Sequence, residues 1–220
     1  MSQPSERGLF IVLEGGEGAG KGSVLSAVAE GLRAQGIEPL CTRAPGGTAE
    51  GQVIRSALVQ SGAAWEPTAE LLLMMADRAQ HVGRLIRPAL ETGRVVLCDR
   101  FVGSTIAYQG GGRGLSSAMI LELQKIAAAG VAADLNILLD VPPAIGLKRS
   151  LKRLAEEKSS EDLFERLDLS FHERVRASFL DQAAADSEHW TVIDASRPIV
   201  VVIAEVQVRL DELLEKRSAA

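Results

Sequence analysis

The feature that most constrains this sequence is an apolar run that ends in a glycine-rich turn and is followed by a stretch of helical periodicity. Residues 9–13 read LFIVL, and after the turn residues 23–35 place apolar side chains at helical spacing. Further apolar runs of strand length lie at 37–41, 95–98, 135–141 and 191–195, and further helical stretches at 68–91, 116–129 and 200–216. Continuously apolar strands that alternate with helices predict a three-layer α/β fold, with a central parallel sheet of about five strands flanked by helices.

The bulk composition predicts one soluble domain spanning residues 1–220. The chain is 46% hydrophobic with a formal net charge of −5. It contains no apolar window of membrane-spanning length, and its polar start lacks the pattern of a secretory signal, so we expect a cytoplasmic protein without a membrane partner. The acidic balance, with no basic block, argues against a nucleic-acid partner. Cys41 and Cys98 each adjoin an apolar run and are expected to be reduced and buried.

The glycine-rich turn matches the phosphate-binding signature G-x-x-x-x-G-K. Backbone N–H groups of such a loop, together with the positive end of the following helix, attract an anion. We therefore expect an ATP-binding loop formed by Gly15, Gly16, Glu17, Gly18, Ala19, Gly20, Lys21, Gly22 and Ser23. Lys21 is placed to reach the β- and γ-phosphates. The alternative interpretation is a tight turn that only happens to be rich in glycine.

The position that usually supplies a hydroxyl to Mg²⁺ is occupied by Gly22, and Ser23 follows one residue later. Because Mg²⁺ keeps several waters when phosphates supply other ligands, Ser23 can serve as a ligand directly or through water. Glu17 lies inside the loop, where a carboxylate needs a hydroxyl or a cation beside it. We interpret Glu17 as a group that contacts substrate.

The third apolar run ends in Asp99-Arg100. An acid at the carboxyl end of a strand is suited to hold a metal through water, and a guanidinium there is suited to grip a phosphate. The alternative is an exposed local ion pair, which the buried run before Asp99 makes less favourable.

These residues belong to a set of motifs that resembles the thymidylate kinase family from about residue 10 to residue 194. The motifs are GxEGAGK at 15–21, TRxPGGT at 42–48, ADRAQHVxxxIRPAL at 76–90, VLCDRFVxSTIAYQGGGRG at 96–114 and LDVPP at 139–143. The resemblance implies a P-loop kinase fold and transfer of the γ-phosphoryl group of Mg·ATP to dTMP. Mg²⁺ is the implied cofactor, with Ser23 and Asp99 as its implied ligands, and ATP is the co-substrate.

The resemblance also assigns roles to acceptor residues. Arg43 and Arg100 would bind the 5′-phosphate of dTMP, Arg78 the base, and Glu17 the sugar hydroxyl or the phosphate edge. Tyr108 would lie against the deoxyribose. The remaining implied substrate-binding residues are Met74, Ser104 and Gln109.

A mobile cover is implied at about residues 148–166. In the bacterial form of the family the cover supplies arginines that the P-loop lacks, and here Arg149 and Arg153 stand four apart. With Lys21, Asp99 and Arg100 they complete the implied catalytic set. Arg197 is a weaker candidate for a place near the adenine. The family is typically homodimeric, and the apolar face of the 68–91 helix could serve either dimerisation or internal packing.

Four positions depart from the family pattern: Gly22, Ala44, Met74 and Leu163. Met74 stands where a phenylalanine usually stacks on the base, so a pyrimidine monophosphate kinase with shifted base choice is one alternative. The losses at the other three positions motivate a second alternative, a nucleotide-binding paralogue with weakened catalysis.

Overall fold

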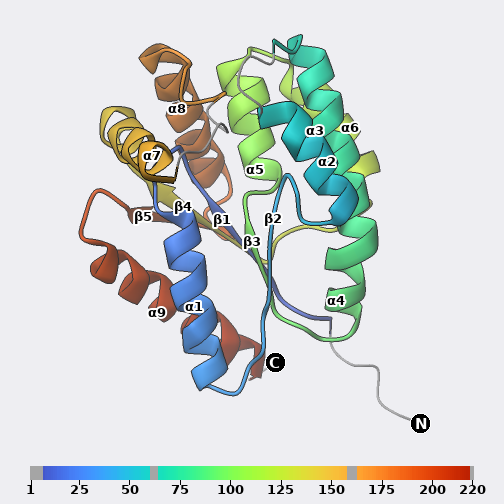
Figure 1. Cartoon of the computed structure of the whole chain (residues 1–220). Coiled ribbons are helices and arrows are strands. Elements are labelled where there is room, and N and C mark those ends of the chain that lie inside the picture. Colours follow the sequence, from blue (N-terminus) through green and yellow to red (C-terminus); the bar gives the residue numbers. More distant parts are fainter. Residues whose placement is uncertain (1–6, 60–63, 158–162, 219–220) are drawn as a thin grey trace.

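The computed structural model describes residues 7–59, 64–157 and 163–218. Its centre is a parallel sheet in the order β2-β3-β1-β4-β5 (Figure 1). The strands are Phe10–Glu14 (β1), Leu40–Arg43 (β2), Val96–Asp99 (β3), Leu135–Asp140 (β4) and Trp190–Asp194 (β5). This confirms the expected α/β class with five parallel strands.

Helices cover both faces of this sheet. They are Lys21–Ala34 (α1), Ala49–Val59 (α2), Pro67–His81 (α3), Arg87–Glu91 (α4), Val102–Thr105 (α5), Ser117–Ala128 (α6), Pro143–Glu157 (α7), Leu169–Ala185 (α8) and Ile199–Ser218 (α9), with π-helical stretches at Val82–Ile86 (η1) and Ile106–Gly112 (η2). Within the described ranges, none of the helices combines the length and apolarity that a membrane crossing requires.

Strand β1 shows how the layers are held together. Ile11 and Leu13 pack into a core shared with α1 and α9. Phe10 and Val12 point the other way and pack with residues of η1, α4 and β3. A strand that buries both sets of side chains must be apolar throughout, which is why its sequence does not alternate.

The expected boundaries are close, with two differences that have physical causes. The second strand begins at Leu40 rather than at residue 37, since Pro39 has no N–H for a sheet ladder and the N–H of Ile37 closes helix α1 on Leu32. The segment after Arg100 is helical although it carries three consecutive glycines. A Cβ at Gly112 would lie 2.5 Å from the ring of Phe171, so glycine there permits the close approach of α8.

One expectation about the cysteines is wrong. Cys98 is buried in the central strand β3, but Cys41 is exposed on β2. Strand β2 is the edge strand of the sheet, and its residues alternate between half-buried and exposed. An edge strand covered incompletely on one face leaves such a thiol in solvent.

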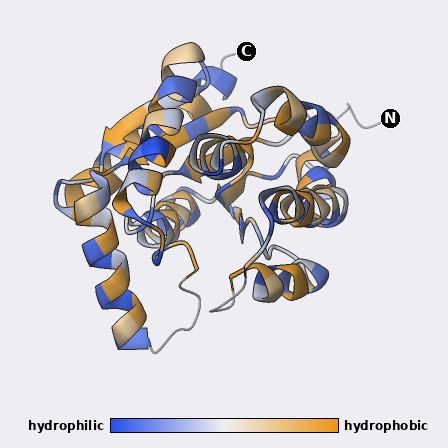
Figure 2. Cartoon of the chain, turned by 90° about the horizontal axis from the view of Figure 1, so that it is seen from above, coloured by the Kyte–Doolittle hydropathy of each residue, from blue (hydrophilic) through white to orange (hydrophobic). Residues whose placement is uncertain are grey.

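The segment expected to form the cover begins as helix α7, which projects from the body of the molecule and carries many hydrophilic residues (Figure 2). Residues 158–162 of the expected cover lie outside the described residues. The chain returns at Leu163, Phe164 and Glu165, which line the same pocket as Arg153 of α7.

Candidate functional site

The candidate site lies where the carboxyl ends of β1 and β3 meet. Leu13 of β1 is in register with Asp99 of β3, so the loop after β1 lies beside the Asp99-Arg100 pair. Adjacent parallel strands place their carboxyl ends on one edge, which is where open α/β sheets bind ligands. The topology therefore brings together the two motifs that lie about 80 residues apart in the sequence.

The loop after β1 has the shape of an anion-binding cradle. Gly18 has a φ of 64°, and a Cβ on it would lie 1.9 Å from the carbonyl oxygen of Gly146, so no side chain fits. Helix α1 begins directly after the loop, at Lys21, and contributes its free N–H groups and positive dipole end.

Lys21 closes this cradle. Its side chain is buried, and Nζ donates to the carbonyl oxygens of Gly15 at 3.0 Å and Gly16 at 2.9 Å. Burial lowers the pKa of Lys21 to about 8, and the nearby Arg100 acts in the same direction. The ammonium is thus held in a poorly solvated position with only carbonyl oxygens as partners, and a phosphate would be a stronger acceptor.

Arg100 links the cradle to the neighbouring pocket. It adopts a left-handed φ of 69°, uncommon for a residue with a side chain and often found at functional sites. Its Nη1 donates to Gly15 O at 2.9 Å and to Ser104 Oγ at 3.1 Å, and its Nη2 pairs with Glu17 Oε1 at 2.9 Å. The guanidinium also lies over the ring of Tyr108, 5.0 Å from its centroid.

Glu17 is held by two donors. Besides Arg100, the hydroxyl of Tyr108 donates to Glu17 Oε1 at 2.7 Å. Burial alone would raise the pKa of Glu17, but Arg100 and Lys21 outweigh it and hold that pKa at about 2. Glu17 is therefore a carboxylate at neutral pH, and it is able to accept from a ligand hydroxyl.

Glu14 is a structural acid that the sequence analysis missed. It is fully buried at the end of β1 and accepts from Phe101 N at 3.0 Å, Ser104 N at 3.1 Å and Ser104 Oγ at 2.5 Å. Burial raises its pKa. These bonds fix the turn after β3 and thereby the position of Arg100. A charged residue that ends an otherwise apolar strand was the available sequence signal.

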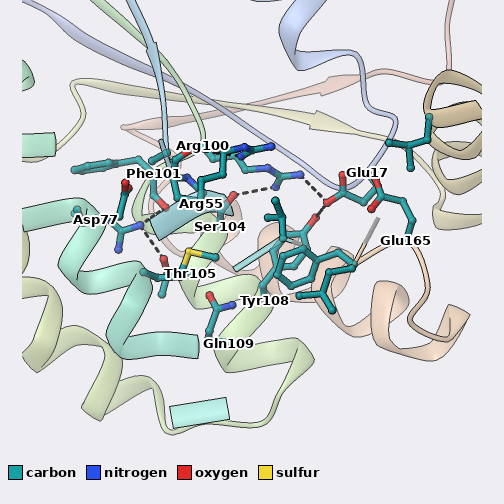
Figure 3. Close-up of a pocket in the computed structure, with 18 of the residues that line it drawn as sticks. Glu17, Arg55, Asp77, Arg100, Phe101, Ser104, Thr105, Tyr108, Gln109 and Glu165 are labelled. Atoms are coloured by element: carbon teal, nitrogen blue, oxygen red, sulfur yellow. Dashed lines mark hydrogen bonds and ion pairs between the residues drawn. The ribbon is translucent and has the colours of Figure 1, made fainter. Parts of the chain in front are cut away.

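A pocket with about 870 Å³ of empty space, open to solvent, lies next to the cradle. Figure 3 shows Arg100, Glu17 and Tyr108 along one side of the pocket, with Thr105 and Gln109 at its far end. The pocket therefore has a charged end next to the loop and a polar end away from it.

Arg78 is fixed at the far end of the pocket. It is 3% exposed, and its Nη atoms donate to Gln124 Oε1 at 2.8 Å, Phe101 O at 2.9 Å and Thr105 Oγ1 at 2.8 Å. Its Nε has no hydrogen-bond partner among the described residues. Met74 lines the pocket and is half-buried, whereas its neighbour Met75 is the one that lies in the core.

Most of the predicted acceptor residues meet in this pocket. It is lined by Glu17, Met74, Arg78, Arg100, Ser104, Tyr108 and Gln109. Arg43 is not among the lining residues: its side chain is exposed and donates to Gln52 at 3.3 Å. Arg55 of α2 lines the pocket instead. Arg55 was not predicted from the sequence, because nothing in the motif of residues 42–48 marks the helix that follows it.

The two arginines of α7, Arg149 and Arg153, contact different parts of the molecule. Arg153 lines the pocket and pairs with Glu157 at 3.0 Å. Arg149 is not among the residues that line the pocket, and it donates to the carbonyl oxygens of Ala195 at 2.7 Å and Ser196 at 3.0 Å. Arg197 pairs with Glu205 and donates to the carbonyl oxygen of Asp194.

Two residues are available for a metal ion. The Oδ1 of Asp99 is buried and has no hydrogen-bond partner among the described residues, as expected of a carboxylate oxygen that can meet a cation or its water. Ser23 is exposed in the first turn of α1. In the described part of the chain no cluster of three or more His, Cys, Asp or Glu residues could hold a metal. The donor set thus fits an ion such as Mg²⁺, which takes most of its ligands from phosphates and water.

Comparisons with known proteins agree with this geometry. The family model described as thymidylate kinase matches residues 13–206. A thymidylate kinase of Cereibacter sphaeroides is 53% identical over 192 residues, covering 86% of this chain and 88% of that protein. Thymidylate kinases of Thermosynechococcus vestitus and Pseudomonas fluorescens are 46% and 45% identical, covering 91% and 95% of this chain and 86% and 98% of their own lengths.

Proposed function

The chain belongs to the thymidylate kinase family, and on that premise we propose that it transfers the γ-phosphoryl group of ATP to dTMP, giving dTDP and ADP. The observation that carries this proposal is the position of Arg100. One guanidinium contacts both Gly15 of the phosphate cradle and Glu17 of the neighbouring pocket. A kinase for a small acceptor needs its donor and acceptor sites joined at such a point.

The donor side is built from the loop at residues 15–20 and from Lys21. We assign the triphosphate of ATP to the cradle, with Lys21 moving from the loop carbonyls to the β- and γ-phosphates. The adenine is assigned to the segment near Ser196, whose carbonyl oxygen Arg149 holds. This gives Arg149 a role in shaping the adenine site, and Arg197 lies in the same segment.

The acceptor side is the pocket. Arg100 is assigned to the 5′-phosphate, together with Arg55, which lines the pocket where Arg43 had been expected. Glu17 and Tyr108 are assigned to the sugar, since a carboxylate accepts from a hydroxyl and a ring packs against a ring. The polar end, with Arg78 and Gln109, is assigned to the base, and Ser104 steadies Arg100.

Asp99 and Ser23 are the residues that would hold Mg²⁺, with Asp99 acting through water. The ion, when bound, neutralises phosphate charge and aligns the donor. Because Gly22 offers no hydroxyl, the protein would supply few of the ligands of the Mg²⁺ ion. Asp99 Oδ1, which the protein leaves without a partner, is then the main protein group for the ion.

The chemistry needs positions and charges rather than a covalent intermediate. An oxygen of the acceptor phosphate attacks the γ-phosphorus in line, and the bond to the bridging oxygen of the β-phosphate breaks. We assign two cations to the transferring group, Lys21 at the start of α1 and Arg153 on α7. Their cations stabilise the charge that spreads over the γ-oxygens in the transition state.

A coupled assay of ADP release tests the function. Purified protein is given Mg·ATP with dTMP, dUMP, dCMP or dGMP, and dTMP is expected to be the preferred acceptor. Arg100→Ala and Lys21→Ala are expected to abolish turnover while the fold is retained. ATP binding without turnover on any monophosphate would show that the proposal is wrong and would favour a non-catalytic nucleotide-binding protein. Equal rates with dTMP and dCMP would instead favour the kinase with shifted base choice.

We further propose that the protein is a homodimer. Leu72 of α3 is 51% exposed, and exposed apolar residues also lie on the helices beside it, Val53 on α2 and Leu121 on α6. Sedimentation of the wild type and of a Leu72→Glu variant tests this, with a monomeric wild type contradicting it. A cytoplasmic location stays a prediction.

A further inference from the structure

Glu70 is a fully buried carboxylate that the proposed reaction does not use. It lies on α3 with 0% of its surface exposed. Its Oε2 pairs with Arg113 Nη2 at 2.8 Å, while its Oε1 accepts from Arg113 Nε at 3.3 Å and from Gln109 Nε2 at 2.7 Å. A buried charge is costly unless it is paired and hydrogen-bonded, and Glu70 meets both conditions.

The contact with Glu70 decides which way the amide of Gln109 faces. A carboxylate that is bonded to a guanidinium offers only acceptors, so the amide must turn its NH₂ group toward Glu70. The amide oxygen is then left on the other side. Among the residues that the structure describes, none donates a hydrogen bond to that oxygen. Gln109 lines the pocket, and Figure 3 shows its amide end directed toward the pocket interior.

Arg78, at the same end of the pocket, contributes a hydrogen-bond donor, whereas Gln109 contributes an acceptor. The Nε–H of Arg78 is buried and has no partner among the described residues. Arg78 and Gln109 both line the pocket, so this end of it combines a donor residue with an acceptor, the amide oxygen of Gln109. With Arg78 assigned to the substituent at C4 and Gln109 to N3, a pyrimidine with a carbonyl at C4 and a hydrogen on N3 matches this pair. Cytosine does not, because its N3 carries no hydrogen and its C4 carries an amino group.

We propose that Glu70 is a positioning residue for base selection: it holds Gln109 as an acceptor-only group and thereby favours pyrimidine-2,4-diones over cytosine. This inference rests on the proposed function. Arg113 belongs to the same device, because its guanidinium pairs with Glu70 and holds that side chain in place beside Gln109. Sites that hydrogen-bond a substrate group discriminate strongly against an analogue that lacks it, since a buried polar group is then left unpaired.

The test is a Glu70→Gln variant assayed with dTMP and dCMP. The new amide can donate to Gln109 and so allow its amide to turn around. We expect the ratio of kcat/KM for dTMP to that for dCMP to fall by roughly tenfold or more, the scale of one mispaired buried hydrogen bond. Glu122→Gln is the matched control, because Glu122 is an exposed acid on α6 paired with Lys125, and it should leave the ratio unchanged.

Two further variants make the result specific. In Glu70→Gln the guanidinium of Arg113 loses its carboxylate partner, which can prevent folding. The double variant Glu70→Gln/Arg113→Met removes this guanidinium as well. If the single variant does not fold, the double variant should show the same fall in the ratio of kcat/KM. In a Gln109→Leu background the Glu70→Gln change should leave the ratio unaltered, because Glu70 acts through Gln109.

The outcomes distinguish failure of the inference about Glu70 from failure of the proposed function. If the wild type phosphorylates dTMP and Glu70→Gln lowers kcat/KM for both nucleotides by the same factor, Glu70 is merely structural and the inference is overturned. A fall in the ratio that persists in the Gln109→Leu background overturns it as well. A wild type without activity on dTMP overturns the proposed function, and this inference with it.

Discussion

Replacing Lys21 by methionine is expected to destroy activity and at the same time stabilise the fold. Lys21 is 7% exposed, and burial lowers the pKa of its ammonium from the usual 10.5 to about 8, despite the acids around it. The unfolded chain therefore binds this proton more tightly than the folded protein does. Each tenfold difference in proton affinity corresponds to about 1.4 kcal/mol, so the wild type is destabilised by about 3 kcal/mol at pH 7.

The loss of the two hydrogen bonds of Lys21 offsets part of this gain. Gly15 O keeps Arg100 as a donor, so only Gly16 O is left without one, at a cost of about 1 kcal/mol. Lys21→Met should thus raise the free energy of unfolding by about 2 kcal/mol at pH 7. The penalty on the wild type is fully present below pH 8 and fades as the pH rises from 8 to 10.5. The difference between variant and wild type should therefore approach zero by about pH 10.

Urea unfolding at pH 7, 8, 9 and 10, followed by the fluorescence of Trp65 and Trp190, measures this difference. Lys125→Met is the matched control, because the ammonium of Lys125 is exposed and its replacement should give a difference that hardly varies with pH. A difference for Lys21→Met that stays constant from pH 7 to 10, or that grows, would refute the reasoning. Loss of turnover by roughly 100-fold or more in the same variant would show that the destabilising ammonium is the functional one.

Four other variants probe the remaining parts of the site. Arg153→Met should lower kcat by roughly 100-fold with little change in KM for dTMP, whereas Arg149→Met should mainly raise KM for ATP, as steady-state kinetics will show. Asp99→Asn should raise the Mg²⁺ concentration for half-maximal rate by roughly tenfold, measured by Mg²⁺ titration at fixed ATP. Gly22→Thr should lower that concentration: a Cβ at Gly22 meets nothing within 4 Å, so the hydroxyl can be added without a clash.

The architecture was predictable because it depends on local patterns. Each buried strand is an apolar run, and each strand ends in a turn that carries polar or glycine residues. The helix at residues 102–112 was not predictable in the same way, since Gly110, Gly111 and Gly112 disfavour helices in isolation. It forms because α8 packs against it, with Phe171 and Val175 close to Gly112. Tertiary packing overrides propensity there, and no local pattern reports it.

The site was predictable to the extent that its residues follow strands directly. Arg100 and Glu17 come immediately after β3 and β1, and the register of the sheet brings them together. Arg55 and Glu70 lie on helices whose facing side depends on how those helices pack, so their positions became visible only in the structure. The same holds for Arg149 and Arg153, which are one helical turn apart on α7 yet have different surroundings: Arg149 contacts the segment after β5, whereas Arg153 lines the pocket.

The buried Lys21 ammonium and the half-buried Arg100 guanidinium lie at the same edge of the sheet, and Arg100 contributes to the lowered pKa of Lys21. Glu17 offsets this repulsion, which is why its pKa is held at about 2. In the proposed complex the phosphates take over this role for both cations, and Glu17 becomes free to accept from the acceptor's hydroxyl. Poor solvation of Lys21 thus lowers the stability of the free protein. The same poor solvation strengthens the attraction of Lys21 for phosphate, because a poorly solvated cation has little hydration to lose when the phosphate binds.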